Sequence, residues 1–222
     1  MTVGLHPRLL GRALRRPRFL RGSEAEEHVT AETIRTPRLT LRPYAASDAA
    51  AWYDLQSAPE VLRYLDWPAR DREASRVHLL DRTRHTRLWQ ADDILALAVE
   101  HHGELIGDAT LQLRAVAAEV RTVEIGWIVH PRASGRGIAT EASLAMIRIA
   151  FDSLHAKIVT AVIRSPNTRS LAMADRLGFQ EMDRSNGDVL MVLNRSAFMD
   201  HLAACAQLRE LLAPRRRERA LA

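Results

Sequence analysis

A short glycine-containing loop between a predicted strand and a predicted helix constrains the fold of this chain more than any other feature. The loop, Arg132-Ala-Ser-Gly135-Arg-Gly137, follows an apolar run over residues 120–129 and precedes helical periodicity over residues 137–154. The start of a helix attracts phosphate oxygens because its N–H groups are unpaired and carry partial positive charge. The loop matches neither Gly-x-Gly-x-x-Gly nor the lysine-containing P-loop, which argues against a dinucleotide or ATP site.

Strand and helix patterns are mixed along the body of the chain and predict an α+β domain. Alternating or β-branched runs predict strands over residues 38–42, 94–100, 105–113, 120–129 and 158–163, and Asn186-Gly187 predicts a hairpin turn between 180–186 and 188–193. Helical spacing and capping residues predict helices over residues 48–57, 71–89, 137–154, 167–177 and 196–212. We expect the helix over 71–89 to bury Ala74, Val77, Leu80 and Leu88, and the last helix to pack through Leu202, Leu208 and Leu211.

Positive charge is concentrated at the two ends of the chain. Residues 1–22 contain six arginines and no acidic residue, whereas residues 23–212 contain 22 basic and 26 acidic residues. A nucleic-acid-binding domain needs basic residues spread over its folded surface, so DNA is not an expected partner. The composition therefore divides the chain into a mobile basic extension over residues 1–32, a domain over 33–200, and a C-terminal helix with a basic tail over 201–222.

Cysteine usage and hydropathy bear on cellular location. The single cysteine, Cys205, cannot form an internal disulfide, and no run of eighteen uncharged apolar residues is present, so we expect a cytoplasmic protein. Residues 1–22 alternate leucine with arginine and lack the continuous apolar centre of a secretory signal. This segment fits either a solvated tail or a basic amphipathic helix that contacts the ribosome or an anionic membrane.

Three segments, in matching order, resemble the GNAT superfamily of N-acetyltransferases. Residues 123–142 resemble its acetyl-coenzyme A-binding motif, with Arg132, Gly135 and Gly137 at the positions of the Gln/Arg-x-x-Gly-x-Gly/Ala signature. Residues 161–179 resemble the family's Asn-x-x-Ser and Leu-Gly-Phe segment. Residues 36–43 look like the start of the branch that contains the ribosomal-protein N-terminal acetyltransferases, and the whole resemblance covers about residues 34–195.

The resemblance implies a mixed, mostly antiparallel sheet flanked by helices, splayed between its fourth and fifth strands, with coenzyme A in the opening. Those strands would be about 120–129 and 158–163. The backbone of Ile128 and Val129 would pair with the pantetheine arm of coenzyme A. The N–H groups of residues 133–137 would hold its pyrophosphate. Backbone groups left unpaired by a splay need such a partner. The cofactor-binding residues implied in this way are Ile128, Val129, Arg132, Ser134, Gly135, Arg136, Gly137, Ile138, Ala139 and Asn167.

The resemblance also implies two catalytic residues, Glu124 and Ser170. Glu124 stands where many members have a carboxylate that accepts the proton of the amine, because an ammonium is not a nucleophile; the alternative is a solvated or ion-paired glutamate. Ser170 is a candidate hydrogen-bond donor to the departing sulfur. Asn167 lies on the same helix face as Ser170. It is expected to hold the pantetheine arm, to cap the helix, or to do both. The family's usual tyrosine acid is replaced here by Ala174, which favours direct attack and a loosely assisted thiolate departure.

The expected function is transfer of an acetyl group from acetyl-coenzyme A to a primary amine, either a protein N-terminus or a small amine. Two alternatives stay open: a coenzyme A-binding regulatory protein without turnover, and a ribosome- or membrane-associated protein that acts through residues 1–22. A homodimer is a further expectation. The histidines lack metal-ligand spacing, so no metal is expected, and the mildly acidic body favours a cationic acceptor.

Overall fold

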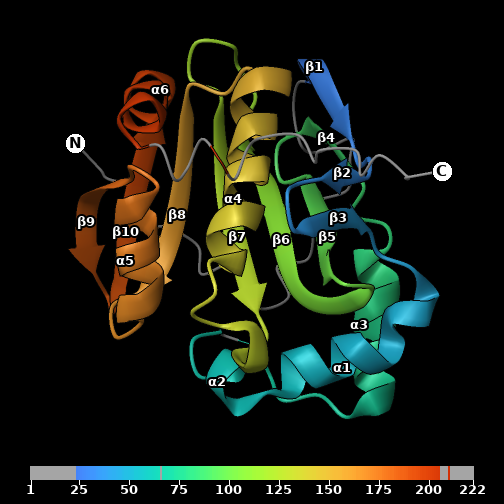
Figure 1. Ribbon diagram of the computed structural model, residues 1–222. Coiled ribbons are helices and arrows are strands. Elements are labelled where there is room, and N and C mark those ends of the chain that lie inside the picture. The colour runs from blue at the N-terminus through green and yellow to red at the C-terminus, as the bar shows by residue number, and fades with distance from the viewer. Residues whose placement is uncertain (1–23, 66, 206–209, 211–222) are drawn as a thin grey trace, which may run out of the picture.

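The computed structural model describes residues 24–65, 67–205 and 210 (Figure 1). Its strands are β1 (Glu24–Thr30), β2 (Ile34–Arg35), β3 (Leu39–Pro43), β4 (Arg87–Gln90), β5 (Ile94–His101), β6 (Glu104–Ala115), β7 (Thr122–Val129), β8 (Ile158–Arg164), β9 (Gln180–Ser185) and β10 (Asp188–Asn194). Its α-helices are α1 (Ala49–Ser57), α2 (Pro59–Leu62), α3 (Arg72–Arg82), α4 (Ile138–Arg148), α5 (Thr168–Arg176) and α6 (Arg195–Ala204). No helix in these ranges has the length and apolar character needed to cross a membrane.

The strands form one main sheet, and helices pack on both of its faces. The sheet has eight strands in the order β2-β3-β5-β6-β7-β8-β10-β9, and a separate pair joins β1 to β4. Residues of α4 and α5 share one core cluster with the sheet, whereas residues of α1, α2 and α3 share a second cluster with β5, β6 and β7. In Figure 1, α4 crosses the front of the sheet and α1 and α2 lie at its lower end. This arrangement confirms the predicted α+β class.

The sheet opens between β7 and β8, the only parallel neighbours in it. These two strands pair at Thr122↔Ile158, Val123↔Val159 and Glu124↔Thr160, and no further. Beyond that point β7 stays paired with β6 as far as Val129, and β8 stays paired with β10 as far as Arg164. The facing edges of β7 and β8 therefore separate, which confirms the predicted splay at the predicted strands.

The prediction of a helix over residues 71–89 is wrong about where the helix ends and about which of its faces is buried. It stops at Arg82, and Leu88 is buried in β4 instead. Val77 and Leu80, predicted to be buried, are 57% and 39% exposed. The side that packs on the sheet carries Ser75, Leu79 and Arg82, because Arg82 forms a buried ion pair with Asp108 of β6. Apolar spacing alone could not reveal a helix face that packs through an arginine.

Part of the segment predicted as an N-terminal extension, residues 1–32, belongs to the fold. Residues 24–30 form β1, in which Ala25 is buried and the Glu27 carboxylate accepts a hydrogen bond from Arg121 Nη1. The basic segment over residues 1–22 lies outside the described residues, as do Leu208 and Leu211 of the predicted last helix. Leu202, the remaining residue of that prediction, is half-buried against the core.

Candidate active site

The loop between β7 and α4 depends on glycine for its backbone conformation. A 3-10 turn over Pro131–Ala133 follows β7, and α4 begins at Ile138. Gly135 and Gly137 have φ angles of +76° and +73°, a left-handed region that costs other residues about 1–2 kcal/mol. A Cβ atom at Gly135 would meet nothing within 4 Å, whereas at Gly137 it would lie 3.2 Å from Arg38 Nη2. The Gly135 side of the loop therefore faces open space, where an anion could approach the backbone.

Backbone amides of the loop are engaged in its first half and not in its second. Ala133 N–H donates to the His130 carbonyl at 2.9 Å, and Ser134 N–H donates to the Pro131 carbonyl at 3.1 Å. Later amides, from Gly135 into the first turn of α4, stand where a helix start leaves N–H groups without intrahelical acceptors. Two of the five amides predicted to hold the pyrophosphate, those of Ala133 and Ser134, therefore already have backbone acceptors.

A buried glutamate in the first turn of α4 fastens this loop to the start of the sheet. The Glu141 side chain has 0% exposure and accepts hydrogen bonds from the Thr36 hydroxyl (2.5 Å), the Arg38 backbone N–H (2.8 Å) and Arg38 Nε (2.6 Å). Arg38 Nη1 in turn donates to the Arg136 carbonyl at 2.8 Å. Arg38 thus balances a carboxylate that would otherwise repel a bound phosphate, and it holds the loop at the same time.

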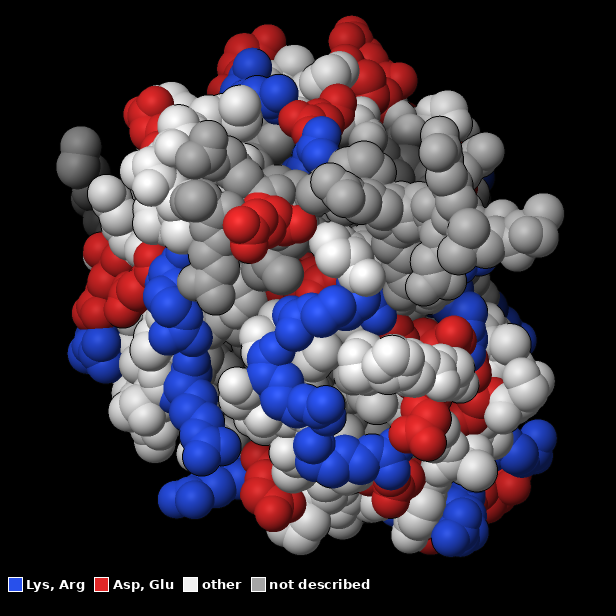
Figure 2. All heavy atoms as spheres, viewed as in Figure 1, with Lys and Arg blue, Asp and Glu red and all other residues white. Residues whose placement is uncertain are grey.

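Positive side chains gather beside the loop. Figure 2 shows Lys and Arg side chains grouped around the lower end of α4. Arg132 and Arg136, which precede α4 in the sequence, are both exposed. Arg132 Nη1 lies 3.8 Å from Asp54 Oδ2, and Arg132 Nη2 lies 3.6 Å from Glu104 Oε2. Such long pairs between exposed groups contribute about 0–1 kcal/mol, so a phosphate can compete for Arg132.

Glu124 lies at the last paired position of β7 and β8, where the opening begins. Its side chain is 23% exposed, and its Oε2 atom accepts hydrogen bonds from Arg114 Nε (3.0 Å) and Nη2 (2.7 Å). The neighbouring Val123 and Ile125 belong to the core cluster of α4, so strand alternation places Glu124 on the opposite face. The ion-paired alternative is therefore observed, and the position of Glu124 adjoins the opening.

Trp127 and Ser170 connect β7 to α5 across the opening. Trp127 lies beyond the last position at which β7 pairs with β8, and its Nε1–H donates to Ser170 Oγ at 3.3 Å. Asn167 caps α5, because its Oδ1 accepts the Ser170 backbone N–H at 3.2 Å, which confirms the predicted cap. Ala174 has 0% exposure in the core, so that position contributes no acid to the site.

The predicted pantetheine-binding strand has a free edge. Ile128 and Val129 pair with Asp108 and Gly107 of β6 on one side, and the β8 side has no strand partner there. The structure therefore brings the predicted residues Glu124, Ile128, Val129, Gly135, Arg136, Gly137, Asn167 and Ser170 to the borders of one opening. The contact between Arg38 and Glu141 was not predicted, because residues 103 positions apart produce no spacing signal.

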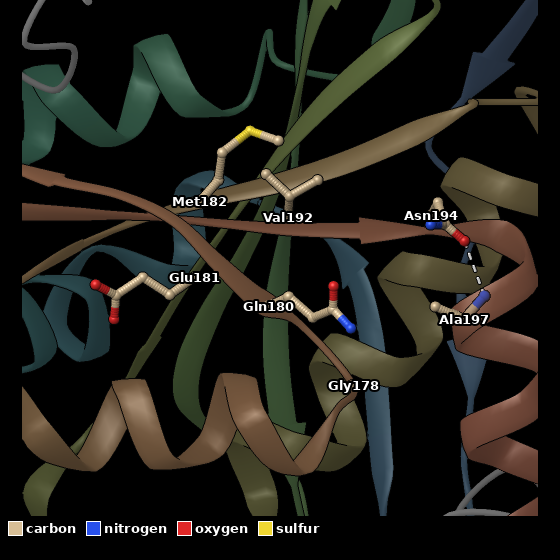
Figure 3. A pocket seen from close by; sticks show the side chains of 7 residues that line it. All are labelled: Gly178, Gln180, Glu181, Met182, Val192, Asn194 and Ala197. Atoms are coloured by element: carbon tan, nitrogen blue, oxygen red, sulfur yellow. Dashed lines mark hydrogen bonds between the residues drawn. The ribbon is translucent and has the colours of Figure 1, made fainter.

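Other candidate sites do not compete with this opening. A surface hollow of about 190 Å³ is lined by Gly178, Gln180, Glu181, Met182, Val192, Asn194 and Ala197 (Figure 3). It lies at the β9 edge of the sheet, separated from β7 by β8 and β10. Its Asn194 Oδ1 already accepts the Ala197 backbone N–H at 2.8 Å. Across the described part of the chain, no group of three or more His, Cys, Asp and Glu side chains could hold a metal ion.

Comparisons with known proteins agree with this geometry. Residues 38–180 match the model of the family described as "Acetyltransferase (GNAT) domain". The chain is 29% identical over 151 residues to the uncharacterized N-acetyltransferase p20 of Bacillus licheniformis, a match that covers 68% of this chain and 83% of that protein. Its structure is similar to a GCN5-related N-acetyltransferase from Brucella melitensis (TM-score 0.68, 20% identity, covering 85% and 89% of the two chains). It is also similar to Mycobacterium smegmatis RimJ in complex with CoA-disulfide (TM-score 0.59, 23% identity, covering 82% and 97%).

Proposed function

Since this chain belongs to the GNAT family of acetyltransferases, we propose that it transfers the acetyl group of acetyl-coenzyme A to a primary amine. One observation carries the proposal: the opening between β7 and β8 ends at a left-handed glycine loop that starts α4. An unpaired strand edge suits an extended amide-bearing arm, and a helix start suits its pyrophosphate. The CoA-disulfide bound by the similar RimJ structure is consistent with a ligand of this chemistry.

Cofactor binding would use mainly backbone groups. The free edge of β7 at Ile128 and Val129 would pair with the pantetheine amides. Amides from Gly135 to Ala139 would donate to the pyrophosphate, with Arg132 and Arg136 adding charge and the Ser134 side chain exposed beside them. Asn167 and Ile138 would border the arm from α5 and α4.

The reaction we propose is direct attack within a ternary complex. The neutral amine attacks the thioester carbonyl, its N–C bond forms, and the C–S bond breaks to release the coenzyme A thiolate. Glu124 would accept the proton that the amine loses, directly or through a water molecule. Ser170 would donate a hydrogen bond to the departing sulfur, and because Trp127 donates to its Oγ, the Ser170 proton can point elsewhere. Position 174, where the family often has a tyrosine acid, is a buried alanine. The thiolate would therefore leave without a proton from a tyrosine.

A coenzyme A-binding protein with little turnover is the second candidate. The Arg114–Glu124 ion pair favours it, because a glutamate held by an arginine can have a purely structural role. The acceptor is either a protein N-terminus, as in the ribosomal-protein branch, or a small amine. Release of free thiol from acetyl-coenzyme A in the presence of an amine panel separates an enzyme from a binding protein.

Ligand-induced stabilisation tests the loop assignment. Acetyl-coenzyme A should raise the melting temperature, because a ligand at 100 times its Kd adds about 2.7 kcal/mol to the free energy of unfolding. Gly135→Asp should abolish this rise, since it places a carboxylate beside the pyrophosphate. The matched control is Gly103→Asp, because Gly103 also has a left-handed φ (+81°) and open space around its Cβ position but lies in the β5–β6 turn. An unchanged rise in Gly135→Asp, or an equal loss in both variants, would remove the assignment.

A further inference from the structure

Trp127 of β7 reaches α5 across the opening. Its Nε1–H donates to Ser170 Oγ at 3.3 Å, and both side chains are half-buried. Trp127 follows Glu124, the last position at which β7 pairs with β8. The proposed pantetheine arm pairs with Ile128 and Val129 and extends from there toward Glu124. Trp127 therefore stands beside the place that the sulfur of the arm would take.

The Ser170 side chain is held at its oxygen while its own proton stays free. A hydroxyl group has one proton to donate and two lone pairs that accept, whereas an indole N–H only donates. Trp127 uses one lone pair of Ser170 Oγ, and no described residue accepts the Ser170 proton. Because Trp127 cannot accept that proton, the O–H bond points away from the indole. The free proton is thus available to a ligand in the opening.

Packing fixes the two partners of this hydrogen bond. Trp127 packs against the core cluster that contains Ile125 of β7 and Met173 of α5. Asn167 Oδ1 accepts the Ser170 backbone N–H at 3.2 Å and so sets the first turn of α5. A side chain locked by packing and by a neighbouring hydrogen bond holds its functional group in one direction. The indole N–H therefore has a defined position relative to the hydroxyl.

Trp127 and Glu124 point to opposite faces of the sheet. Along β7, Val123, Ile125 and Trp127 face the core cluster that includes α4 and α5. Glu124 alternates with them and shares its face with Ile128, which belongs to the cluster of α1, α2 and α3. A thioester in the opening would thus meet a carboxylate from one face and a hydroxyl from the other. Direct attack suits this arrangement, because the amine approaches and the thiolate departs on different sides of the carbonyl carbon.

The buried alanine at position 174 increases the importance of this contact. It lies one helical turn after Ser170 on α5 and has 0% exposure, so it supplies no acid. Ser170 is then the group on α5 that can stabilise the departing sulfur. Its O–H bond rotates freely unless a partner fixes it, and a fixed donor avoids reorganisation during the reaction.

We propose that Trp127 is a positioning residue for acetyl transfer: its N–H turns the Ser170 proton toward the sulfur of the thioester. The inference rests on the proposed function and adds a residue to its departure step. When the C–S bond breaks, its electron pair stays on the sulfur. Ser170 keeps its proton and donates a hydrogen bond to the thiolate. This hydrogen bond strengthens as charge develops, so its effect belongs mainly to kcat.

A double-mutant cycle on kcat tests the role of Trp127. Ser170→Ala should lower kcat by roughly tenfold or more, the value of a hydrogen bond to a charged group. Trp127→Phe keeps an aromatic ring and removes the N–H, so it should lower kcat by about fivefold and change the KM for acetyl-coenzyme A little. In the Ser170→Ala background, Trp127→Phe should change kcat by less than about twofold, because no hydroxyl remains to be oriented.

The matched control is Trp89→Phe, because Trp89 lies in β4 beside His28 and Arg87, away from the opening. It should leave kcat unchanged. A purely structural role of Trp127 would lower kcat by the same factor with and without the Ser170 hydroxyl. That result, or an unchanged kcat in Trp127→Phe, would overturn the inference.

A second measurement decides the inference without turnover. The ultraviolet absorbance of the thiolate, followed over pH in complexes with free coenzyme A and corrected for the ligand-free protein, reports ionisation of the bound thiol. The ionisation constant should be about tenfold larger in the natural chain than in Ser170→Ala, and Trp127→Phe should lower it in the same direction. Equal constants in the natural chain and Trp127→Phe would overturn the inference.

The two measurements separate this inference from the proposed function. If coenzyme A binds but no amine is acetylated, the proposed transfer fails and ionisation of the bound thiol alone decides the role of Trp127. If the amine is acetylated and the cycle is additive, the transfer stands and the inference fails. Absence of coenzyme A binding would remove both.

Discussion

At the residue scale, Glu124 combines a structural contact with a position suited to chemistry. Arg114 contacts only one of its carboxylate oxygens, Oε2, through two nitrogens. Within the described ranges Oε1 has no hydrogen-bond donor, and it belongs to the residue at which β7 and β8 part. A carboxylate with one oxygen anchored and the other free is well oriented to accept a proton.

Glu124→Gln should therefore lower turnover by roughly 10²–10⁴-fold, the usual loss of a positioned general base. The loss should be largest at low pH, where more of the amine is protonated, and coenzyme A affinity should change little. Initial rates over a range of pH check this expectation.

Arg114→Gln is the control, because it breaks the same ion pair and keeps the carboxylate. It should retain most of the turnover. An equal loss in both variants, or a loss below about threefold for Glu124→Gln, where a base would give at least 10²-fold, would assign Glu124 to a structural role.

At the element scale, α3 is held by a polar contact on its buried side. Arg82 and Asp108 are each buried and form an ion pair, and Tyr44 completes it. Removal of one member of such a pair costs about 3–5 kcal/mol, because it leaves an uncompensated charge. The apolar residues Val77 and Leu80 point to the exposed side instead. The orientation of α3 therefore follows its charges.

His78 on α3 should make the fold sensitive to acid. Its folded pKa of about 3 lies well below its ordinary 6.5, because of burial and the charges of Arg70 and Arg82. The unfolded chain therefore binds a proton that the folded chain does not, and stability falls as pH drops from 6.5 toward 3.

Denaturant unfolding at about pH 7 and about pH 5 measures this effect, with a slope of at most about 1.4 kcal/mol per pH unit for one proton. The decrease between the two pH values should be smaller in His78→Leu than in the natural chain. Equal decreases in the two proteins would contradict it.

At the scale of the whole molecule, β1 connects the first described residues to the region around β7 and β8. Its Glu27 pairs with Arg121, which is 2% exposed and also donates from Nη1 to the Leu154 carbonyl at 2.7 Å. Arg121 lies just before β7, and the Leu154 segment precedes β8. β1 also pairs with β4, so it contacts a third part of the sequence.

Deletion of residues 1–22 should leave the melting temperature and acetyl-coenzyme A affinity almost unchanged, because β1 is kept. The same deletion should weaken attachment to anionic vesicles or ribosomes, and the difference should vanish as salt rises, since it depends on six arginines without local acids. Thermal melts and co-sedimentation measure the two effects.

Deletion of residues 1–30 is the comparison, because it also removes β1 and leaves Arg121 without Glu27. It should lower the melting temperature clearly. Loss of cofactor binding on removal of residues 1–22 alone would show that the basic segment is part of the fold.

The sequence by itself determined the local features of this protein. Gly135 and Gly137 stand where φ is positive, Asn186-Gly187 forms the hairpin turn, with φ angles of +53° and +83°, and Asn167 caps α5. The splay between β7 and β8 also followed, because it comes with the glycine loop in the family that the chain resembles. The glycine loop, the hairpin turn and the cap each depend on residues a few positions apart, whose backbone preferences are expressed before any distant contact forms.

Only the tertiary structure decided which distant side chains meet. Arg38 with Glu141, Trp127 with Ser170, and Arg82 with Asp108 join different elements, and no periodicity or spacing in the sequence marks them. The buried face of α3 was predicted wrongly for the same reason. Helical spacing shows where apolar residues lie, but it does not show that Arg82 has an ion-pair partner, Asp108, on β6. Charged and hydrogen-bonding groups are buried only where a partner removes the cost of desolvation, and that partner is supplied by the fold.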